Sequence, residues 1–175
     1  AKDEGQELRS LGVTMNFAPD ADVTVGPSDP TIGVRSPSSD PQRVARAVNA
    51  QVAGYQQAGI VPVIKHFPGH GSVTTDTHVD YAVQAQSVEQ LMKRDWVPFA
   101  SASKAGVPAI MTAHIVVKDV DPNVPSTLSP KVLTGQLRDK LGFKGLIVTD
   151  GMNMGAIVKK FDRGGAAAVS ALEAG

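Results

Sequence analysis

Hydrophobic and polar residues follow one pattern four times along the chain. Each copy is a helix-like segment that ends in a glycine, followed by a short apolar run that ends in polar residues. The four glycines, which suit the left-handed position that closes a helix, are Gly12, Gly59, Gly106 and Gly142. The apolar runs lie at residues 13–18, 60–66, 109–114 and 146–150. Successive copies are roughly 40 residues apart, the length of a strand–helix unit with its loop, so the pattern predicts four parallel strands with intervening helices.

Start signals for the intervening helices support this alternation. Asp40 followed by Pro41 is expected to begin one helix. Its inner face is expected to consist of Val44, Val48, Val52 and Tyr55. Residues 87–90, Ser-Val-Glu-Gln, are typical of a capping box, and Pro98 is expected to kink or end the helix that follows. A third helix is expected to start at Ser129, directly before a proline.

Both ends of the chain resemble helices without a neighbouring strand, at residues 1–11 and 170–175. The sequence is therefore expected to come from the middle of a larger α/β array, as one domain over residues 1–175. Four parallel strands can form a small open sheet, but they do not close a barrel of eight.

Composition and charge exclude several classes of protein. The chain has 175 residues, of which 42% are hydrophobic and 19% charged, as is ordinary for a globular domain. Its formal net charge is zero, so bulk electrostatics favours neither a nucleic-acid partner nor an anionic membrane. The absence of cysteine excludes disulfides, thiolate metal sites and a cysteine nucleophile. No apolar run is long enough to span a membrane, and no signal peptide is present at the start, although an extracytoplasmic location is slightly favoured.

Candidate chemistry gathers where the predicted strands end. The polar groups at these positions are Asp20, Asp22, Lys65, His66, His114 and Asp150. The carboxyl ends of parallel strands lie on one edge of a sheet, so these groups are expected to converge there. Asp150 follows an apolar strand directly, which suits a nucleophile or a metal ligand; the alternative is an aspartate that caps the loop.

Three of the four histidines lie in residues 65–78, after the second predicted strand. At the end of this stretch, the carboxylate of Asp76 can fix the tautomer of His78 and leave its other ring nitrogen free to exchange a proton. The alternative is a surface turn with an incidental histidine. His66, His70, Asp76 and His78 are also possible metal ligands, but Pro68 and Gly69 rule out a helical zinc motif, and no metal or other cofactor is expected.

A long polar segment, residues 20–40, separates the first strand from the first start signal. It contains several prolines and a single arginine, Arg35. Such a segment is either a solvated loop with no task or, because it follows a strand, part of a ligand-binding edge.

Six ordered motifs resemble glycoside hydrolase family 3, in its β-N-acetylglucosaminidase (β-N-acetylhexosaminidase, NagZ-like) branch. The most specific is Lys-His-Phe-Pro-Gly-His-Gly at residues 65–71, followed by Asp76-x-His78. The others lie at residues 15–23, 32–36, 40–45, 109–114 and 142–150. The resemblance covers the whole chain, and it implies a TIM (β/α)8 barrel of which the chain holds about strands three to six.

The resemblance also implies an activity and a set of site residues. The family removes terminal N-acetylglucosamine from cell-wall or chitin-derived glycosides with retention, for example in peptidoglycan recycling. By position, Asp150 matches the nucleophile, His78 the general acid/base and Asp76 its partner. Sugar-binding positions are matched by Arg35, Lys65 and His66, with Asp22 orienting them. The first strands of relatives carry a further sugar-binding aspartate and arginine, so residues 1–175 in isolation are expected to be poorly active or inactive.

Other readings of these residues remain open from the sequence. A histidine acid/base tolerates an anionic acceptor better than a carboxylate does, so phosphorolysis is a variant of the same mechanism. A family 3 β-glucosidase is the nearest alternative substrate class, although such relatives usually lack the motif at residues 65–78. Alternatives of another kind are a metal-dependent barrel hydrolase and an inactive sugar-binding fragment. In the leading interpretation the only partner is a carbohydrate, and the oligomeric state is not specified.

Overall fold

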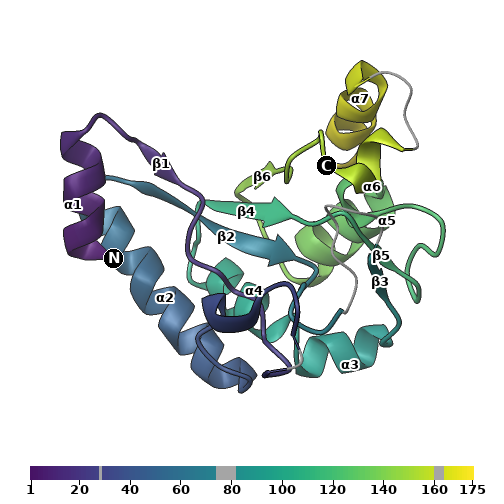
Figure 1. Cartoon of the computed structure of the whole chain (residues 1–175), viewed down its shortest axis with the longest axis horizontal. Helices are drawn as coiled ribbons and strands as arrows, with labels where there is room; N and C mark the ends of the chain where they lie inside the picture. The colour runs from purple at the N-terminus through teal and green to yellow at the C-terminus, as the bar shows by residue number, and fades with distance from the viewer. Residues whose placement is uncertain (28, 74–81, 160–163) are drawn as a thin grey trace.

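A computed structural model of the protein describes residues 1–27, 29–73, 82–159 and 164–175. Its main sheet has four parallel strands in the order β1-β2-β4-β6. Their bounds are β1 Met15–Asn16, β2 Val61–Phe67, β4 Ala109–Thr112 and β6 Leu146–Val148. Each strand falls within or beside one of the four predicted apolar runs, so the predicted parallel α/β sheet is confirmed (Figure 1).

Helices join consecutive strands of the sheet and cover one of its faces. The long helices are α1 Lys2–Ser10, α2 Pro41–Gln57, α4 Val97–Lys104 and α7 Gly164–Ala174. Shorter helical segments are η1 Gly33–Arg35, α3 Val88–Lys93, η2 Ser126–Leu128, α5 Pro130–Val132 and α6 Gly155–Val158. The segment η3, Leu133–Lys140, continues α5 with π-helical hydrogen bonding. Within the described residues, no helix is both long and apolar enough to cross a membrane.

The helix caps follow the local sequence closely. The side chain of Asp40 accepts hydrogen bonds from the amides of Gln42 and Arg43, and α2 buries the four predicted residues of its inner face. Ser87 and Gln90 form the predicted capping box at the start of α3. That helix ends at Lys93, and Pro98 lies in the first turn of the separate helix α4, where a missing N–H costs nothing. The helix is therefore short, as predicted, but it ends at Lys93 and not at Pro98, which lies in the first turn of the next helix.

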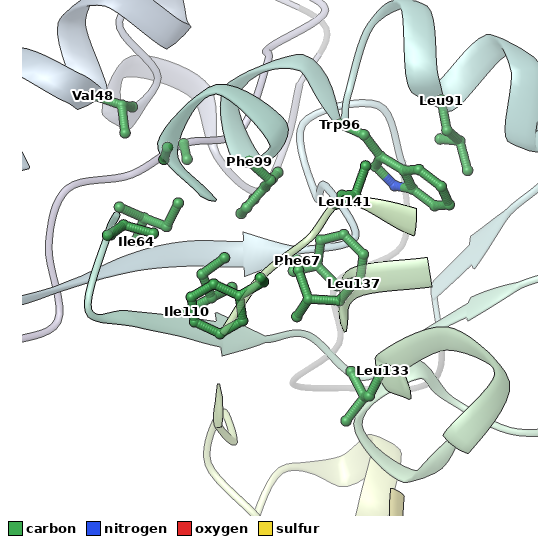
Figure 2. Packing of buried hydrophobic residues seen from close by; sticks show 14 of the residues in the cluster. Val48, Ile64, Phe67, Leu91, Trp96, Phe99, Ile110, Leu133, Leu137 and Leu141 are labelled. Atoms are coloured by element: carbon green, nitrogen blue, oxygen red, sulfur yellow. The ribbon is translucent and has the colours of Figure 1, made fainter. Parts of the chain in front are cut away.

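The main core lies between the sheet and the helices. Ile64 and Phe67 of β2 and Ile110 of β4 pack against residues of α2, α4 and η3, with Trp96 beside them (Figure 2). The ring of Phe67 contacts both Trp96 and Phe99, at centroid distances of 5.7 and 5.4 Å. On the opposite face of the sheet, a smaller cluster consists of Val63, Ala109 and Met111, with Met15 and Val148 against it. The alternation of strand residues thus separates a large helix-facing core from a small inner one.

A second, two-stranded parallel sheet was not predicted. It pairs β3, Ala82–Gln84, with β5, Ile115–Val117. The apolar run that begins at Ala109 therefore contributes to two sheets, because the chain leaves β4 after Thr112 and continues through residues 113–114 into β5. This change of sheet places His114 between two strands, where its side chain is fully buried.

Candidate active site

The chain that follows β1 runs beside the end of β2. Asp20 forms an isolated parallel bridge with Lys65, and the amide of Ala21 donates to the Lys65 carbonyl at 2.6 Å. The peptide bonds Lys65–His66 and Phe67–Pro68 are both cis. This pairing brings Asp20 and Asp22 against Lys65 and His66, although more than 40 residues separate the two segments.

Asp22 is fully buried and fixes the ring of His66. Its Oδ2 accepts from the His66 amide at 3.2 Å and lies 2.8 Å from His66 Nδ1, while its Oδ1 accepts from the His70 amide at 2.6 Å. A carboxylate offers only acceptors, so Nδ1 carries the proton and Nε2 keeps a lone pair. Burial raises the pKa of Asp22, and the His70 amide is the strongest opposing influence. Through these contacts Asp22 can orient the His66 ring, which is the role predicted for it from the sequence.

Burial lowers the pKa of His66 to about 4, so the imidazole is neutral at neutral pH. The negative charges of Asp20 and Asp150 act in the opposite direction, and the positive charges of Lys65 and Arg35 add to the lowering. These four groups therefore lie close enough to His66 to change its protonation. The structure brings all five described candidates, Asp22, Arg35, Lys65, His66 and Asp150, to the carboxyl edge of the sheet.

Asp20 is the most unusual carboxyl group of this edge. Its Oδ1 accepts from the Asp22 amide at 3.0 Å, and its Oδ2 lies 3.8 Å from Arg35 Nη1. Its side chain is only 8% exposed, and burial raises its pKa to about 8, with the charge of Asp22 acting in the same direction. Arg35, at the end of η1, is about half exposed and donates from Nη2 to the Thr31 carbonyl at 2.9 Å. Arg35 thus links Thr31 and Asp20 within the long polar segment, and the segment itself joins the sheet where Asp20 and Ala21 pair with Lys65.

Asp150 follows β6 and is held by its own neighbour. Its Oδ1 accepts from the Gly151 amide at 2.7 Å, and no hydrogen bond from the described residues reaches its Oδ2. The other two predicted catalytic residues, Asp76 and His78, lie outside the described residues, and their roles remain predictions from the sequence.

The residues that brace this edge include one carboxylate that sequence reasoning missed. Asp95 is buried and accepts from Ser72 Oγ at 2.7 Å and from Arg94 Nη1 at 2.9 Å. Arg94 also donates to the carbonyls of Val23 and Thr24. Burial raises the pKa of Asp95, and Ser72 is the strongest opposing influence. The only sequence signal was a charged pair beside a tryptophan, which gives no indication of its partners.

Two backbones cross closely behind Asp22. A Cβ on Gly71 would collide with the carbonyl oxygen of Val23, and the Val25 amide donates to the Gly71 carbonyl at 3.0 Å. Only glycine allows this approach. His70, next to it, is buried, and its ring lies edge-on to that of His66 at 6.1 Å.

Asp20, Asp22 and His66 are also the described residues that come nearest to a metal-binding group, since one ligand atom from each lies within 4.8 Å of the others. The contacts that these side chains make are more typical of hydrogen-bonded groups than of metal ligands. Asp22 Oδ2 and His66 Nδ1 already share a hydrogen bond, and Arg35 brings positive charge to Asp20. In this arrangement both carboxyl groups already have hydrogen-bond or ion-pair partners within the chain.

Comparison with known proteins shows first the class of protein that this chain resembles and then the family to which it belongs. A barrel-type glycosidase, the glycoside hydrolase family 3 β-N-acetylglucosaminidase from Paenibacillus sp. str. FPU-7, superposes with a TM-score of 0.94 at 44% identity, over 98% of this chain and 33% of that one. NagZ from Neisseria gonorrhoeae superposes with a TM-score of 0.85 at 33% identity, over 99% of this chain and 49% of that one. The model of the "Glycosyl hydrolase family 3 N terminal domain" matches residues 1–175, and the chain belongs to this family.

A curated relative extends the comparison. A "Beta-hexosaminidase" from Xylella fastidiosa (strain M23) is 42% identical over 151 residues, which cover 86% of this chain and 44% of that protein. The chain thus spans less than half the length of these three relatives. The predicted partial barrel of the TIM type is confirmed by the structural likeness.

Proposed function

We propose that the protein is a retaining exo-β-N-acetylglucosaminidase that removes terminal N-acetylglucosamine from cell-wall or chitin-derived glycosides. The observation that carries the proposal is that Asp150 directly follows β6 and lies close enough to His66 for its charge to act on that ring, on which Lys65 and Arg35 also act. The names of the similar proteins, β-hexosaminidase and β-N-acetylglucosaminidase, support the same reaction. Residues 1–175 would supply about strands three to six of the barrel, as one domain.

In this mechanism Asp150 forms a covalent bond to the sugar. The Oδ2 of Asp150 attacks the anomeric carbon, the bond to the leaving-group oxygen breaks, and that oxygen takes a proton from His78. Water then gives a proton to His78 and attacks the same carbon, which releases Asp150 and a sugar with retained configuration. Asp76 would hold His78 in the required tautomer.

The described residues of the edge would bind the sugar. Lys65 and Arg35 are donors only, so they would bind hydroxyl and carbonyl oxygens of the substrate. Because Asp22 occupies His66 Nδ1, the neutral ring would accept a hydrogen bond from a sugar hydroxyl at Nε2. Asp22 would act through His66 and would not touch the sugar.

The covalent step can be tested directly with the full-length protein. A 5-fluoro derivative of N-acetylglucosaminyl fluoride should inactivate the enzyme, and peptide mass spectrometry should locate the sugar on Asp150. Asp150→Ala should give no adduct and lower kcat by about 10³-fold or more, since it removes the nucleophile. An adduct on another residue, or an unchanged rate in Asp150→Ala, would contradict the proposal.

The same assay can compare substrates. Nitrophenyl N-acetylglucosaminide should be cleaved in preference to nitrophenyl glucoside, and turnover should not depend on added phosphate. Preference for the glucoside would indicate a β-glucosidase. Acceleration by phosphate with formation of the sugar phosphate would indicate phosphorolysis.

A further inference from the structure

We infer that His114 is a positioning residue that fixes the nucleophile Asp150 through Gly151; the inference rests on the proposed function. His114 lies between β4 and β5 and is fully buried. It belongs to a cluster of Thr112, His114 and Thr127, called here the threonine–histidine cluster. His66 and His114 both lie at the carboxyl edge of the sheet, but His114 is hydrogen-bonded to the loop that carries the nucleophile.

Both ring nitrogens of His114 have oxygen partners. Nδ1 lies 2.8 Å from Thr127 Oγ1, and Nε2 lies 3.1 Å from the carbonyl oxygen of Gly151. The hydroxyl of Thr127 lies 2.9 Å from that of Thr112 and 3.0 Å from the carbonyl of Ala113. The cluster therefore connects the end of β4 and the segment η2 to the loop that follows β6.

The identity of the acceptor fixes one proton of the ring. A backbone carbonyl can only accept, so Nε2 must carry the hydrogen that points to Gly151. The hydroxyl of Thr127 can adjust its donor and acceptor roles to either state of Nδ1. The link from His114 to the loop after β6 is thus a directed N–H to carbonyl bond.

Gly151 transmits this restraint to the nucleophile. Its amide donates to Asp150 Oδ1 at 2.7 Å, and its carbonyl accepts from His114. These two bonds hold the peptide groups on either side of a residue that has no side chain of its own. Because glycine rotates more freely than any other residue, a fixed carbonyl is needed to keep its amide, and with it the Asp150 carboxylate, in one orientation.

The position of Asp150 matters because covalent attack depends on alignment. A displacement of about 1 Å in a reacting group can lower the rate about 10²-fold. His114 is fully buried, and its described contact with the loop that carries Asp150 is the bond to Gly151. The expected signature of its loss is a lower kcat with a nearly unchanged KM, since Lys65, Arg35 and His66 bind the sugar from other segments.

Two amide variants of the full-length protein separate positioning from packing. Glutamine places an N–H donor where His Nε2 lies, whereas asparagine places its amide near Nδ1 and does not reach Gly151. His114→Asn should lower kcat and the rate of labelling by the 5-fluoro sugar by about 10²-fold, with KM changed by less than about threefold. His114→Gln should stay within about tenfold of the wild-type rate.

Thr127 offers a second pair of variants, with a smaller expected effect. Thr127→Val removes the hydroxyl that faces Nδ1 at nearly constant volume, and Thr127→Ser keeps it. We expect Thr127→Val to lower the labelling rate by about tenfold and Thr127→Ser to restore it. This pair decides the question if His114→Asn does not fold, as judged by its thermal transition.

The outcomes separate this inference from the proposed function. If the wild-type protein forms no adduct at Asp150, the proposed function fails. If it does, and folded His114→Asn is labelled at the wild-type rate, or His114→Gln is as slow as His114→Asn, the positioning role is overturned. Equal rates for Thr127→Val and Thr127→Ser count against it in the same way.

Discussion

Two buried polar clusters support the same edge of the sheet by different means. The aspartate cluster, Asp20, Asp22 and His66, lies between β1 and β2 and contains two carboxyl groups. The threonine–histidine cluster lies after β4 and surrounds its imidazole with hydroxyl and carbonyl oxygens. In both, one ring nitrogen is fixed by a partner of known polarity, so both rings are held in a defined orientation.

The two clusters differ in how far their hydrogen bonds depend on charge. In the aspartate cluster the pKa values of Asp20, Asp22 and His66 are all shifted, so its hydrogen bonds depend on pH and on the charge of a ligand. The partners of His114 in the described residues are neutral, and they fix geometry in preference to charge. We therefore propose that the first cluster supports sugar binding through His66 and that the second aligns the nucleophile, and this proposal can be tested.

After the loss of the nucleophile itself, the largest effect is expected at His78, which belongs to neither cluster. If His78 is the general acid/base, His78→Ala should lower kcat by about 10²–10⁴-fold and flatten the pH dependence near neutrality. A dinitrophenyl leaving group, which needs no proton, should recover the rate of the first step. An unchanged rate with an ordinary alkyl or sugar leaving group would mean that the proton comes from elsewhere, and that one cluster contributes more chemistry than we assign to it.

Asp22 should be the most sensitive residue for stability within the aspartate cluster. Asp22→Ala leaves the amides of His66 and His70 and the His66 ring without their acceptor, in a site with no exposure. We expect the free energy of unfolding to fall by about 3 kcal/mol or more, measured in urea. Asp22→Asn, which retains one acceptor oxygen, should lose less, and equal losses in the two variants would argue against the hydrogen bonds as the cause.

The smallest expected effect is a pH dependence of stability that distinguishes the aspartate cluster from the threonine–histidine cluster. The pKa of Asp20 is raised to about 8 in the folded protein, so its contribution to stability is present at low pH and is lost as the pH rises toward 8. The pKa of His66 is lowered to about 4, so its contribution is present above pH 6.5 and is lost as the pH falls toward 4. Between pH 6.5 and 8, Asp20 is therefore the one of these two groups whose titration changes the free energy of unfolding.

Thermal unfolding in that window isolates Asp20. From pH 6.5 to 8.5 the Tm of the wild-type protein should fall more than that of Asp20→Asn, which mimics the protonated carboxyl group. Thr112→Val, in the threonine–histidine cluster, should keep the wild-type slope and serves as the matched control. Parallel slopes in wild type and Asp20→Asn would show that Asp20 titrates in its ordinary range.

Short-range patterns explain which parts of the fold could be predicted. The strands, the Asp40 cap and the Ser87 capping box depend on residues within a few positions of one another, and all were confirmed. The strands β3 and β5 have only three residues each, and β5 continues the apolar run of β4, so no sequence boundary marks them.

The residues that gather at the site could be predicted from the sequence, but the hydrogen bonds between them could not. Asp22 and His66 were expected at one edge, yet their hydrogen bond joins residues 44 positions apart, and no local pattern encodes it. Asp95 was missed because its partners, Ser72 and Arg94, come from a different loop and from its own neighbour. The convergence of charges on His66 follows from the parallel sheet, whereas the link from His114 to Gly151 depends on the bend after β4.

The close crossing at Gly71 has a consequence for directed evolution. In a library that randomises every position, residue 71 should return only glycine, although it need not touch any substrate, because the Val23 carbonyl occupies the space of a side chain. Gly135 in η3 has open space around its Cβ position and should accept alanine with a gain in stability. A mutational scan that equates intolerance with catalysis would misplace the active site toward this crossing, and variation aimed at substrate preference is better directed to the polar segment around Arg35.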